Sequence, residues 1–241
     1  MIRREPAHPV PMIRFRYLRL LRRHPSALLL VVQLLGLFLY PAMEDTPDGR
    51  ALFGAFGILV LALALWVVNR SPAINWVAWL LALPALLGSL LGTFAEIPHL
   101  LMLAQLMEAA LYFYTAGSLM AYMLEDHRVT SDELYAAGAT FTLLAWGFAF
   151  AFSVCQQWYP GSFTAAVNPA LPRSWVELLF LSFSVLSGVG LSDIVPIQPQ
   201  ARALVMLAQF AGVMYIAVVV SRLIGLTLLR TKQGGASDGQ A

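Results

Sequence analysis

The sequence predicts an all-α integral membrane protein with six transmembrane helices and a re-entrant helix and loop between the fifth and the sixth. Composition is the first observation: 59% of the 241 residues are hydrophobic and 12% are charged, about half the charged fraction of an average soluble domain. The mean hydropathy is +0.73. The second observation is that several apolar runs approach the roughly 20 residues that a helix needs to cross a bilayer. A shorter apolar run followed by glycine-rich turn residues is the third.

Apolar periodicity places six spans along the chain. They are Ala27–Met43, Ala51–Val68, Ile74–Phe94, Ile97–Leu124, Leu134–Trp158 and Ala201–Leu229. Between the last two, Trp175–Ser187 is too short to span and is predicted to enter and leave by one face. The expected organisation is a basic cytoplasmic segment (1–26), a four-helix unit (27–124), a unit of helix, loop and helix (125–230) and a disordered tail (231–241).

Basic residues are concentrated on one side of the predicted bundle. Seven arginines lie between Arg3 and Arg23, ahead of the first span, and more basic residues follow the second, fourth and sixth spans. Positive residues favour the cytoplasmic side, so both termini are expected inside, in a multi-pass protein of the cell (inner) membrane. Arg14–Arg23, with interleaved aromatic residues and leucines, has the pattern of an amphipathic helix lying on anionic lipid.

The most informative stretch runs from Ser184 to Pro196: the end of a short helix, a glycine-punctuated turn, an aspartate and the approach to a membrane helix. Ser174 and Glu177 fit a capping box at the start of the short helix. Irregular backbone at membrane depth is tolerated only where protein buries it or where it lines a water-filled cavity. A row of backbone carbonyls in such a loop can replace the hydration shell of a cation.

This stretch resembles the pore signature of the potassium-channel superfamily, with a degenerate selectivity filter. The matching filter positions are Ser187, Gly188, Val189, Gly190, Leu191, Ser192 and Asp193, and Ile194-Val195-Pro196 matches the ending of the motif. The pore-helix positions are Trp175, Glu177, Phe180, Leu181 and Ser184. Val129–Asp132 resembles the linker into the fifth helix of bacterial six-span relatives. About the last half of the chain carries the resemblance.

The filter departs from the family pattern at three positions. Gly188 and Gly190 supply the positive φ that alternating carbonyls require, but Ser192 stands where the family has glycine. A non-glycine residue at positive φ costs on the order of 1–2 kcal/mol, so the outermost carbonyl ring is expected to be reoriented or lost. Gly188 replaces a threonine whose hydroxyl is an ion ligand, and Ser187 is the nearest alternative hydroxyl. Leu191 replaces a tyrosine.

An apolar cuff made by Leu191 with Phe180 and Leu181 fixes the pore diameter less firmly than a hydrogen-bonded one. Weaker discrimination between potassium and sodium than in relatives with the full motif is therefore expected. The resemblance implies a homotetramer in the lipid bilayer that conducts monovalent cations, K⁺ and also Na⁺. It implies no cofactor, no metal beyond the permeant cation and no nucleic-acid partner. The negative end of the pore-helix dipole and a ring of Asp193 carboxylates both favour cations.

Three further residues stand out. Glu108, in the fourth span, is either a functional intramembrane carboxylate or a hydrogen-bonded packing residue near Tyr112 or Gln105. Gly212, in the sixth span, is a candidate hinge, with close helix packing as the favoured interpretation. Arg222 is expected to be a lipid-facing anchor rather than a gate contact. The fourth span carries no arginine from Ile97 to Leu124, so an ordinary voltage sensor is not expected.

Three functional hypotheses follow from the sequence. The first is a cation channel gated by something other than voltage, and the second is a non-conducting relative that acts as a structural or regulatory subunit. The third is an intramembrane enzyme, because Gly190-Leu191-Ser192 resembles a serine protease motif. That chemistry needs a basic partner on a neighbouring helix, and no histidine lies in the fifth or sixth span. The protein is therefore expected not to be an enzyme.

Overall fold

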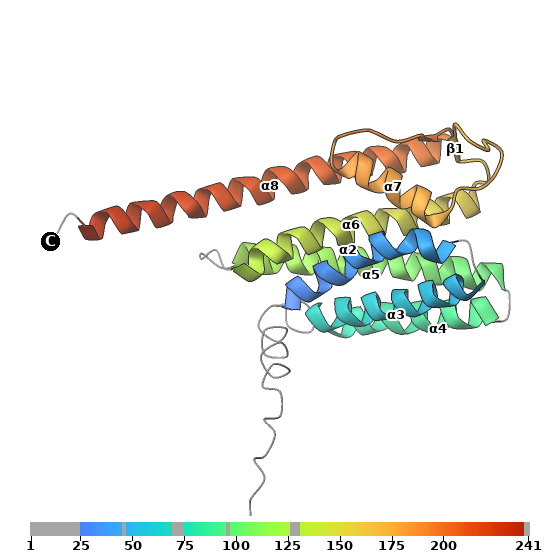
Figure 1. The fold of residues 1–241 in the computed structure, drawn as a ribbon, viewed down its shortest axis with the longest axis horizontal. Helices are drawn as coiled ribbons and strands as arrows, with labels where there is room; N and C mark the ends of the chain where they lie inside the picture. The colour runs from blue at the N-terminus through green and yellow to red at the C-terminus, as the bar shows by residue number, and fades with distance from the viewer. Residues whose placement is uncertain (1–24, 45–46, 69–74, 95–96, 126–130, 239–241) are drawn as a thin grey trace, which may run out of the picture.

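The computed structural model describes residues 25–44, 47–68, 75–94, 97–125 and 131–238 (Figure 1). The segments 1–26 and 125–130 lie mostly outside these ranges, so the predicted amphipathic stretch Arg14–Arg23 and the linker motif Val129–Asp132 are largely beyond what can be compared. The helices are α2 (Pro25–Glu44), α3 (Pro47–Val68), α4 (Asn75–Phe94), α5 (Pro98–Glu125), α6 (Ser131–Trp158), α7 (Trp175–Leu186) and α8 (Pro199–Asp238).

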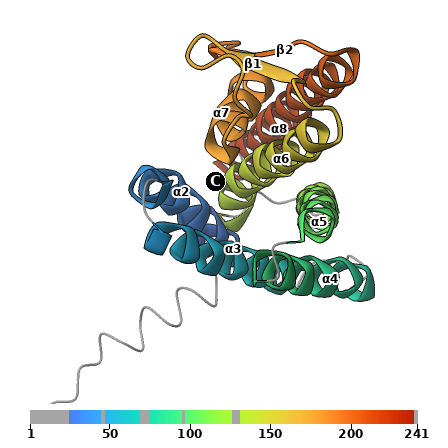
Figure 2. The same cartoon turned by 90° about the vertical axis from the view of Figure 1, so that its right-hand side faces the viewer.

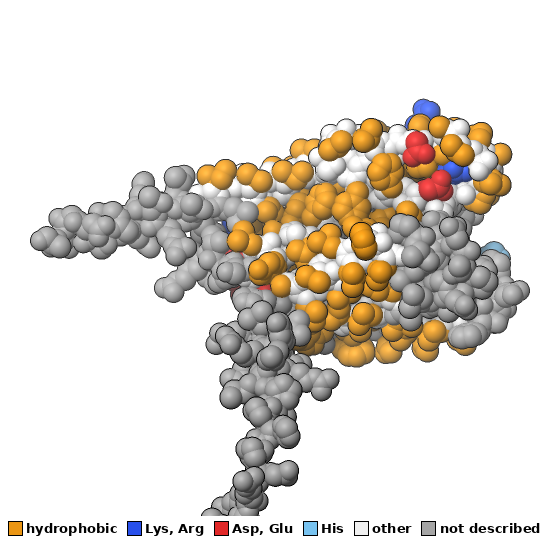
Figure 3. Space-filling view, in the orientation of Figure 1, with side chains coloured by type: hydrophobic (Ala, Val, Ile, Leu, Met, Phe, Trp, Pro, Cys, Tyr) orange, Lys and Arg blue, Asp and Glu red, His pale blue; other side chains and the backbone are white. Residues whose placement is uncertain are grey.

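The helices follow the predicted apolar segments closely, and α7 coincides with the predicted half-helix. Within the described residues, three stretches are long and apolar enough to cross a membrane: His99–Glu125, Asp132–Trp158 and Pro199–Arg222. The apolar stretches described in α2, α3, α4 and α7 are shorter. Hydrophobic side chains cover much of the described surface (Figure 3). The chain is therefore a helical membrane protein with three membrane-length helices, and the full set of six spans stays a prediction.

Helix α6 is the centre of the fold. It packs against α2, α5, α7 and α8, and Figure 2 shows it between α7 and α8 on one side and the α2–α5 helices on the other. In α6, 72% of the apolar membrane-length stretch is buried, compared with 39% of the corresponding stretch in α5 and 22% in α8. Its buried aromatic residues are in ring contact with neighbouring helices, as in the pairs Tyr112–Trp146 and Phe113–Phe148.

Polar side chains also join α6 to the four-helix unit. Thr142 Oγ1 donates to Gln33 Oε1 of α2 at 2.6 Å, and Ser153 Oγ donates to Gln105 Oε1 of α5 at 3.1 Å. Such interhelical bonds hold membrane helices together where lipid gives no hydrophobic drive for association. The fourth and fifth predicted spans therefore form a tight pair within one chain.

A small sheet departs from the all-α prediction. Strands β1 (Phe163–Ala165) and β2 (Ile194–Pro196) pair antiparallel, with Thr164 opposite Val195. Three-residue strands give too short a pattern to predict, and these two come from segments on either side of α7. Because Ile197 N also donates to Ser162 O at 2.8 Å, the segment after the loop is tied to the segment after α6.

The end of the chain also differs from the prediction. Residues 231–241 were expected to be a disordered tail, but α8 continues as a helix to Asp238. A helix that is already nucleated adds residues at little cost, so the favourable start of α8 carries the backbone past the apolar segment. In Figure 1, α8 is the long helix that runs beyond the bundle.

The bond between Thr142 and Gln33 gives a testable prediction. Thr142→Val removes an interhelical hydrogen bond between buried side chains and is expected to lower the unfolding free energy by about 0.6–1.7 kcal/mol. Thr140→Val is the matched control, because that buried hydroxyl donates within α6, to Ala136 O at 2.8 Å. Thermal unfolding of the detergent-solubilised protein measures both. Equal losses for the two variants would contradict a role for the α2–α6 bond.

Candidate functional site

The site begins at the start of α7, where the predicted capping box is present. Ser174 N donates to Glu177 Oε2 at 2.6 Å, and Glu177 N donates to Ser174 Oγ at 3.3 Å. Two backbone donors of the first turn are thereby satisfied. Because Glu177 is an acid in the first turn, it also interacts favourably with the positive end of the helix dipole. Ser174 and Glu177 thus fix where the helix begins.

Arg173 organises the loop ahead of α7, a role that the sequence analysis missed. Its buried guanidinium donates to the carbonyl oxygens of Val167, Asn168 and Leu171 and to Glu177 Oε1. Its backbone is held by Gln156 of α6, whose Oε1 accepts from Arg173 N at 2.6 Å and whose Nε2 donates to Arg173 O at 3.0 Å. The start of α7 is thus fastened to the far end of α6. The sequence did carry a signal: a single arginine that follows two prolines and directly precedes the N-cap serine of α7.

Aromatic contacts seat α7 against α6. The ring of Trp175 lies 5.1 Å from that of Trp146 and 5.4 Å from that of Phe150, measured between centroids. Along α7, Leu181 and Ser184 face the core and are buried. Phe180, by contrast, is 47% exposed. Leu181 is thus occupied within its own chain, which leaves Phe180 as the residue free to contact Leu191 of the proposed cuff.

The loop after α7 reverses direction through two glycines. Gly188 has φ 74° and Gly190 has φ 70°, the left-handed conformation that glycine adopts without a steric penalty. Gly188 N donates to Val185 O at 3.3 Å and Gly190 N donates to Ser184 O at 3.1 Å. A Cβ at either glycine would meet nothing within 4 Å, so the requirement for glycine comes from the backbone and not from space.

The serines of the loop behave differently from each other. Ser187 caps α7, and its Oγ donates to Ser184 O at 3.2 Å, so its hydroxyl proton is used within the chain. Among the residues that the structure describes, Asn168 is the non-glycine residue with positive φ, so Ser192 is not strained in that way. Its Oγ instead accepts from Ile194 N at 3.1 Å. The backbone at Ser192 therefore lacks the positive φ that Gly188 and Gly190 have.

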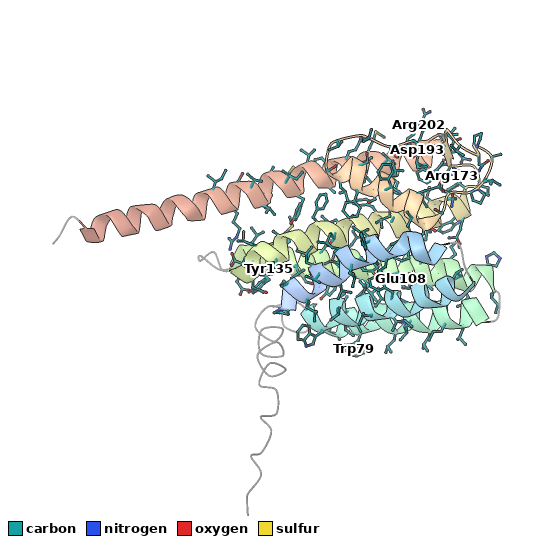
Figure 4. The ribbon with its side chains drawn as sticks, in the orientation of Figure 1. Trp79, Glu108, Tyr135, Arg173, Asp193 and Arg202 are labelled. Atoms are coloured by element: carbon teal, nitrogen blue, oxygen red, sulfur yellow. The ribbon has the colours of Figure 1, made fainter. Side chains whose placement is uncertain are left out.

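Residues 187–191 and Asp193 are exposed in the single chain. Val189 and Leu191 are 69% and 73% exposed, an unusual degree for apolar residues on a loop that is otherwise well bonded. Figure 4 shows Asp193 at the same end of the molecule as Arg173. The structure therefore gathers the predicted filter residues into one exposed loop.

Gly212 of α8 lies against the end of α7. A Cβ on Gly212 would be 2.6 Å from Leu186 Cα, closer than real Cβ atoms approach backbone. Any larger residue would push α8 away from the loop. This contact gives the packing interpretation a concrete partner, and the hinge interpretation stays a prediction.

Two other predicted residues have defined partners. Glu108 is buried and accepts a hydrogen bond from Ser89 Oγ of α4 at 2.7 Å, away from the loop (Figure 4). Its hydrogen-bond partner is thus a serine that the sequence analysis did not name. The prediction that Arg222 faces lipid is wrong: its side chain is 16% exposed and lies 3.8 Å from Glu133 Oε1. The guanidinium is paired with a carboxylate of its own chain instead.

Comparison with known proteins agrees with this geometry. Residues 109–227 match the model of a family described as ion channel. The match covers just under half of the chain, from within α5 into α8, and includes the whole loop. No curated protein and no solved structure matches. This segment is therefore similar to pore-loop ion channels, which indicates ion channel activity in general and a channel rather than an enzyme.

Arg173 gives the prediction of this section. Arg173→Gln leaves three carbonyls and Glu177 without the guanidinium and is expected to cost about 1–3 kcal/mol of stability, the scale of leaving a buried polar group unsatisfied. Arg202→Gln is the control, since that exposed arginine donates to one carbonyl, Pro196 O at 3.3 Å, and should change stability by less than about 0.5 kcal/mol. Thermal unfolding in detergent measures both. A loss for Arg173→Gln no larger than for the control would remove its assigned role.

Proposed function

We propose that the protein is a cation channel that conducts potassium, or monovalent cations with weak selectivity, through a homotetrameric pore. One observation carries the proposal. A short capped helix ends in an exposed loop with two glycines at positive φ, and this loop lies inside the segment that matches the ion channel family. One copy supplies one strand of carbonyls, and a cation needs a ring of them.

Exposed apolar surface supports assembly around the loop. Helix α8 buries one narrow stripe that includes Ala201, Val205, Ala208 and Tyr215. The large residues between these positions are exposed, among them Met206 and Phe210. Part of this surface suits lipid, but the exposed loop beside it does not, because its polar backbone groups require protein or water. Four copies that meet at residues 187–193 would bury one side of each loop in protein and expose the other side to a water-filled pore.

The charge arrangement favours cations. The C-terminal end of α7 carries roughly half a negative charge from its backbone dipoles, and the exposed Asp193 adds a carboxylate close to the loop. In a tetramer these contributions would act four times around one axis. The same sign at both positions disfavours anions regardless of filter detail.

The proposed gating does not involve an arginine voltage sensor. Helix α5, the fourth predicted span, contains no arginine or lysine from Pro98 to Glu125. Voltage sensing requires several charges that move through the membrane field, each worth about 2.3 kcal/mol per 100 mV. The four-helix unit is then a support for the pore domain, in a cell (inner) membrane protein with both termini cytoplasmic.

A non-conducting relative is the second candidate, and the backbone at Ser192 favours it. Ser192 lacks the positive φ of the two glycines and uses its hydroxyl to hold Ile194 N. A filter that has lost its outermost carbonyl ring could serve as a structural subunit instead of a pore. Conduction by the purified protein separates the two candidates.

Reconstituted protein is expected to conduct cations with a potassium-to-sodium permeability ratio below roughly tenfold, because the filter lacks the hydroxyl cuff and one carbonyl ring. Bi-ionic reversal potentials in planar bilayers measure the ratio, and an anion-flux assay in liposomes is the control. A ratio above that limit would contradict weak selectivity. An absence of flux in protein shown to be folded and tetrameric would favour the non-conducting relative.

Restoring the family motif should sharpen selectivity. The triple variant Gly188→Thr, Leu191→Tyr and Ser192→Gly supplies the missing hydroxyls and a glycine that can take positive φ. The expected result is a higher potassium-to-sodium ratio in the same bilayer measurement. Leu171→Tyr, on the exposed loop before α7, is a control for adding a tyrosine outside the filter. An unchanged ratio in the triple variant would mean that these three positions do not set the selectivity.

A further inference from the structure

A charged contact joins three helices at the end of the bundle opposite the loop. Arg222 of α8 lies with Nη2 3.8 Å from Glu133 Oε1, in the first turn of α6. Its Nη1 donates to Leu124 O, near the end of α5, at 3.4 Å. The Glu133 side chain is 4% exposed and the Arg222 side chain 16%. The contact therefore lies largely out of solvent, where charges interact more strongly than at a wet surface.

Apolar side chains surround this contact. Met120 and Met123 of α5, Ala137 of α6, and Val218 and Val219 of α8 line the same crevice as the charged pair. A long arginine side chain commonly lays its carbon stem along such a surface while its head finds a charged partner. The carbon stem of Arg222 thus lies among apolar side chains between α8 and the α5–α6 corner, and its guanidinium reaches Glu133.

A second polar contact lies two helical turns away on the same face of α8. Tyr215 Oη donates to Ala137 O of α6. Residues seven apart lie on one face of an α-helix, so Tyr215 and Arg222 together fasten this stretch of α8 to α6. The C-terminal part of α8 runs beyond the rest of the bundle (Figure 1).

We propose that Arg222 and Glu133 form a latch that holds the inner end of α8 against its own α5–α6 corner and so favours an open inner mouth. The proposal rests on the proposed channel function. In a tetramer with the loops at its axis, the latched end of each α8 is drawn toward its own subunit and away from the other three. Releasing the latch frees the four ends to approach one another. The device works through a partner contact inside one subunit and needs no voltage sensor.

Single-channel recording tests the latch. Arg222→Gln and Glu133→Gln are each expected to shift the open–closed equilibrium toward closed by at least about fivefold, the lower end of typical coupling between conformational sites. Unitary conductance and the reversal potential should stay unchanged, because the contact includes none of the loop residues 187–193. The double variant should resemble either single variant, since the first substitution already removes the shared contact.

Glu125→Gln is the matched control, because Glu125 is an exposed carboxylate at the end of α5. Its open probability should equal that of the unmodified protein. The latch would be refuted by an unchanged open probability in both single variants, by additive effects in the double variant, or by an equal effect of Glu125→Gln.

A distance measurement tests the latch without conduction. Spin labels on Glu125→Cys and Ser221→Cys, in a Cys155→Ser background and diluted with unlabelled protein, report the separation of α8 from the corner within one chain. Adding Arg222→Gln should lengthen or broaden the distance distribution. An unchanged distribution refutes the latch even if the protein proves not to conduct. A changed distribution in a non-conducting protein supports the latch and rejects the channel function.

Discussion

The structure depends on one constraint, the satisfaction of the backbone polar groups at the two ends of α7 and in the loop that follows it. Helix α7 has 12 residues, too few to cross a bilayer, and unpaired backbone groups at its ends would be costly wherever water does not reach them. At its start, Ser174 and Glu177 satisfy each other's backbone donors. At its end, the N–H groups of Ser187, Gly188 and Gly190 donate to the last carbonyls of the helix. The two positive φ angles are the geometric condition for these last bonds.

Meeting that constraint fixes the parts around α7. The loop before it is gathered by one buried arginine, and the segment after it is paired with the chain that follows α6. Both arrangements hold α7 and its flanking segments against α6 and the chain that follows it. That helix in turn is bonded to α2 and α5 through Thr142 and Ser153. The position of the loop is therefore set by α6, the most buried of the three membrane-length helices that the structure describes, and not by its own few residues.

Most of the helices could be predicted because each depends on residues close together in the sequence. Apolar run length located the helices, and the Ser-x-x-Glu spacing located the start of α7. The two loop glycines were identified because positive φ is a property of single residues. What escaped prediction depends on pairs far apart in sequence: Arg173 with Gln156, β1 with β2, and Glu133 with Arg222. Arg222 shows most clearly what sequence alone cannot predict. A basic residue near the end of an apolar helix fits a lipid anchor, and only the structure shows Glu133 beside it.

The two interpretations of Gly212 meet in this geometry. Close contact with Leu186 fixes the first part of α8 to the end of α7, so that part cannot move without disturbing the loop. Tyr215 and Arg222 hold the next two turns to α6 by polar contacts, which can be broken and remade with less rearrangement than a packed backbone. If the proposed latch is released, the part of α8 beyond Gly212 is therefore the part that is free to move. A residue that is needed for packing can then also mark where a bend starts, because the helix is rigidly held on one side of it only.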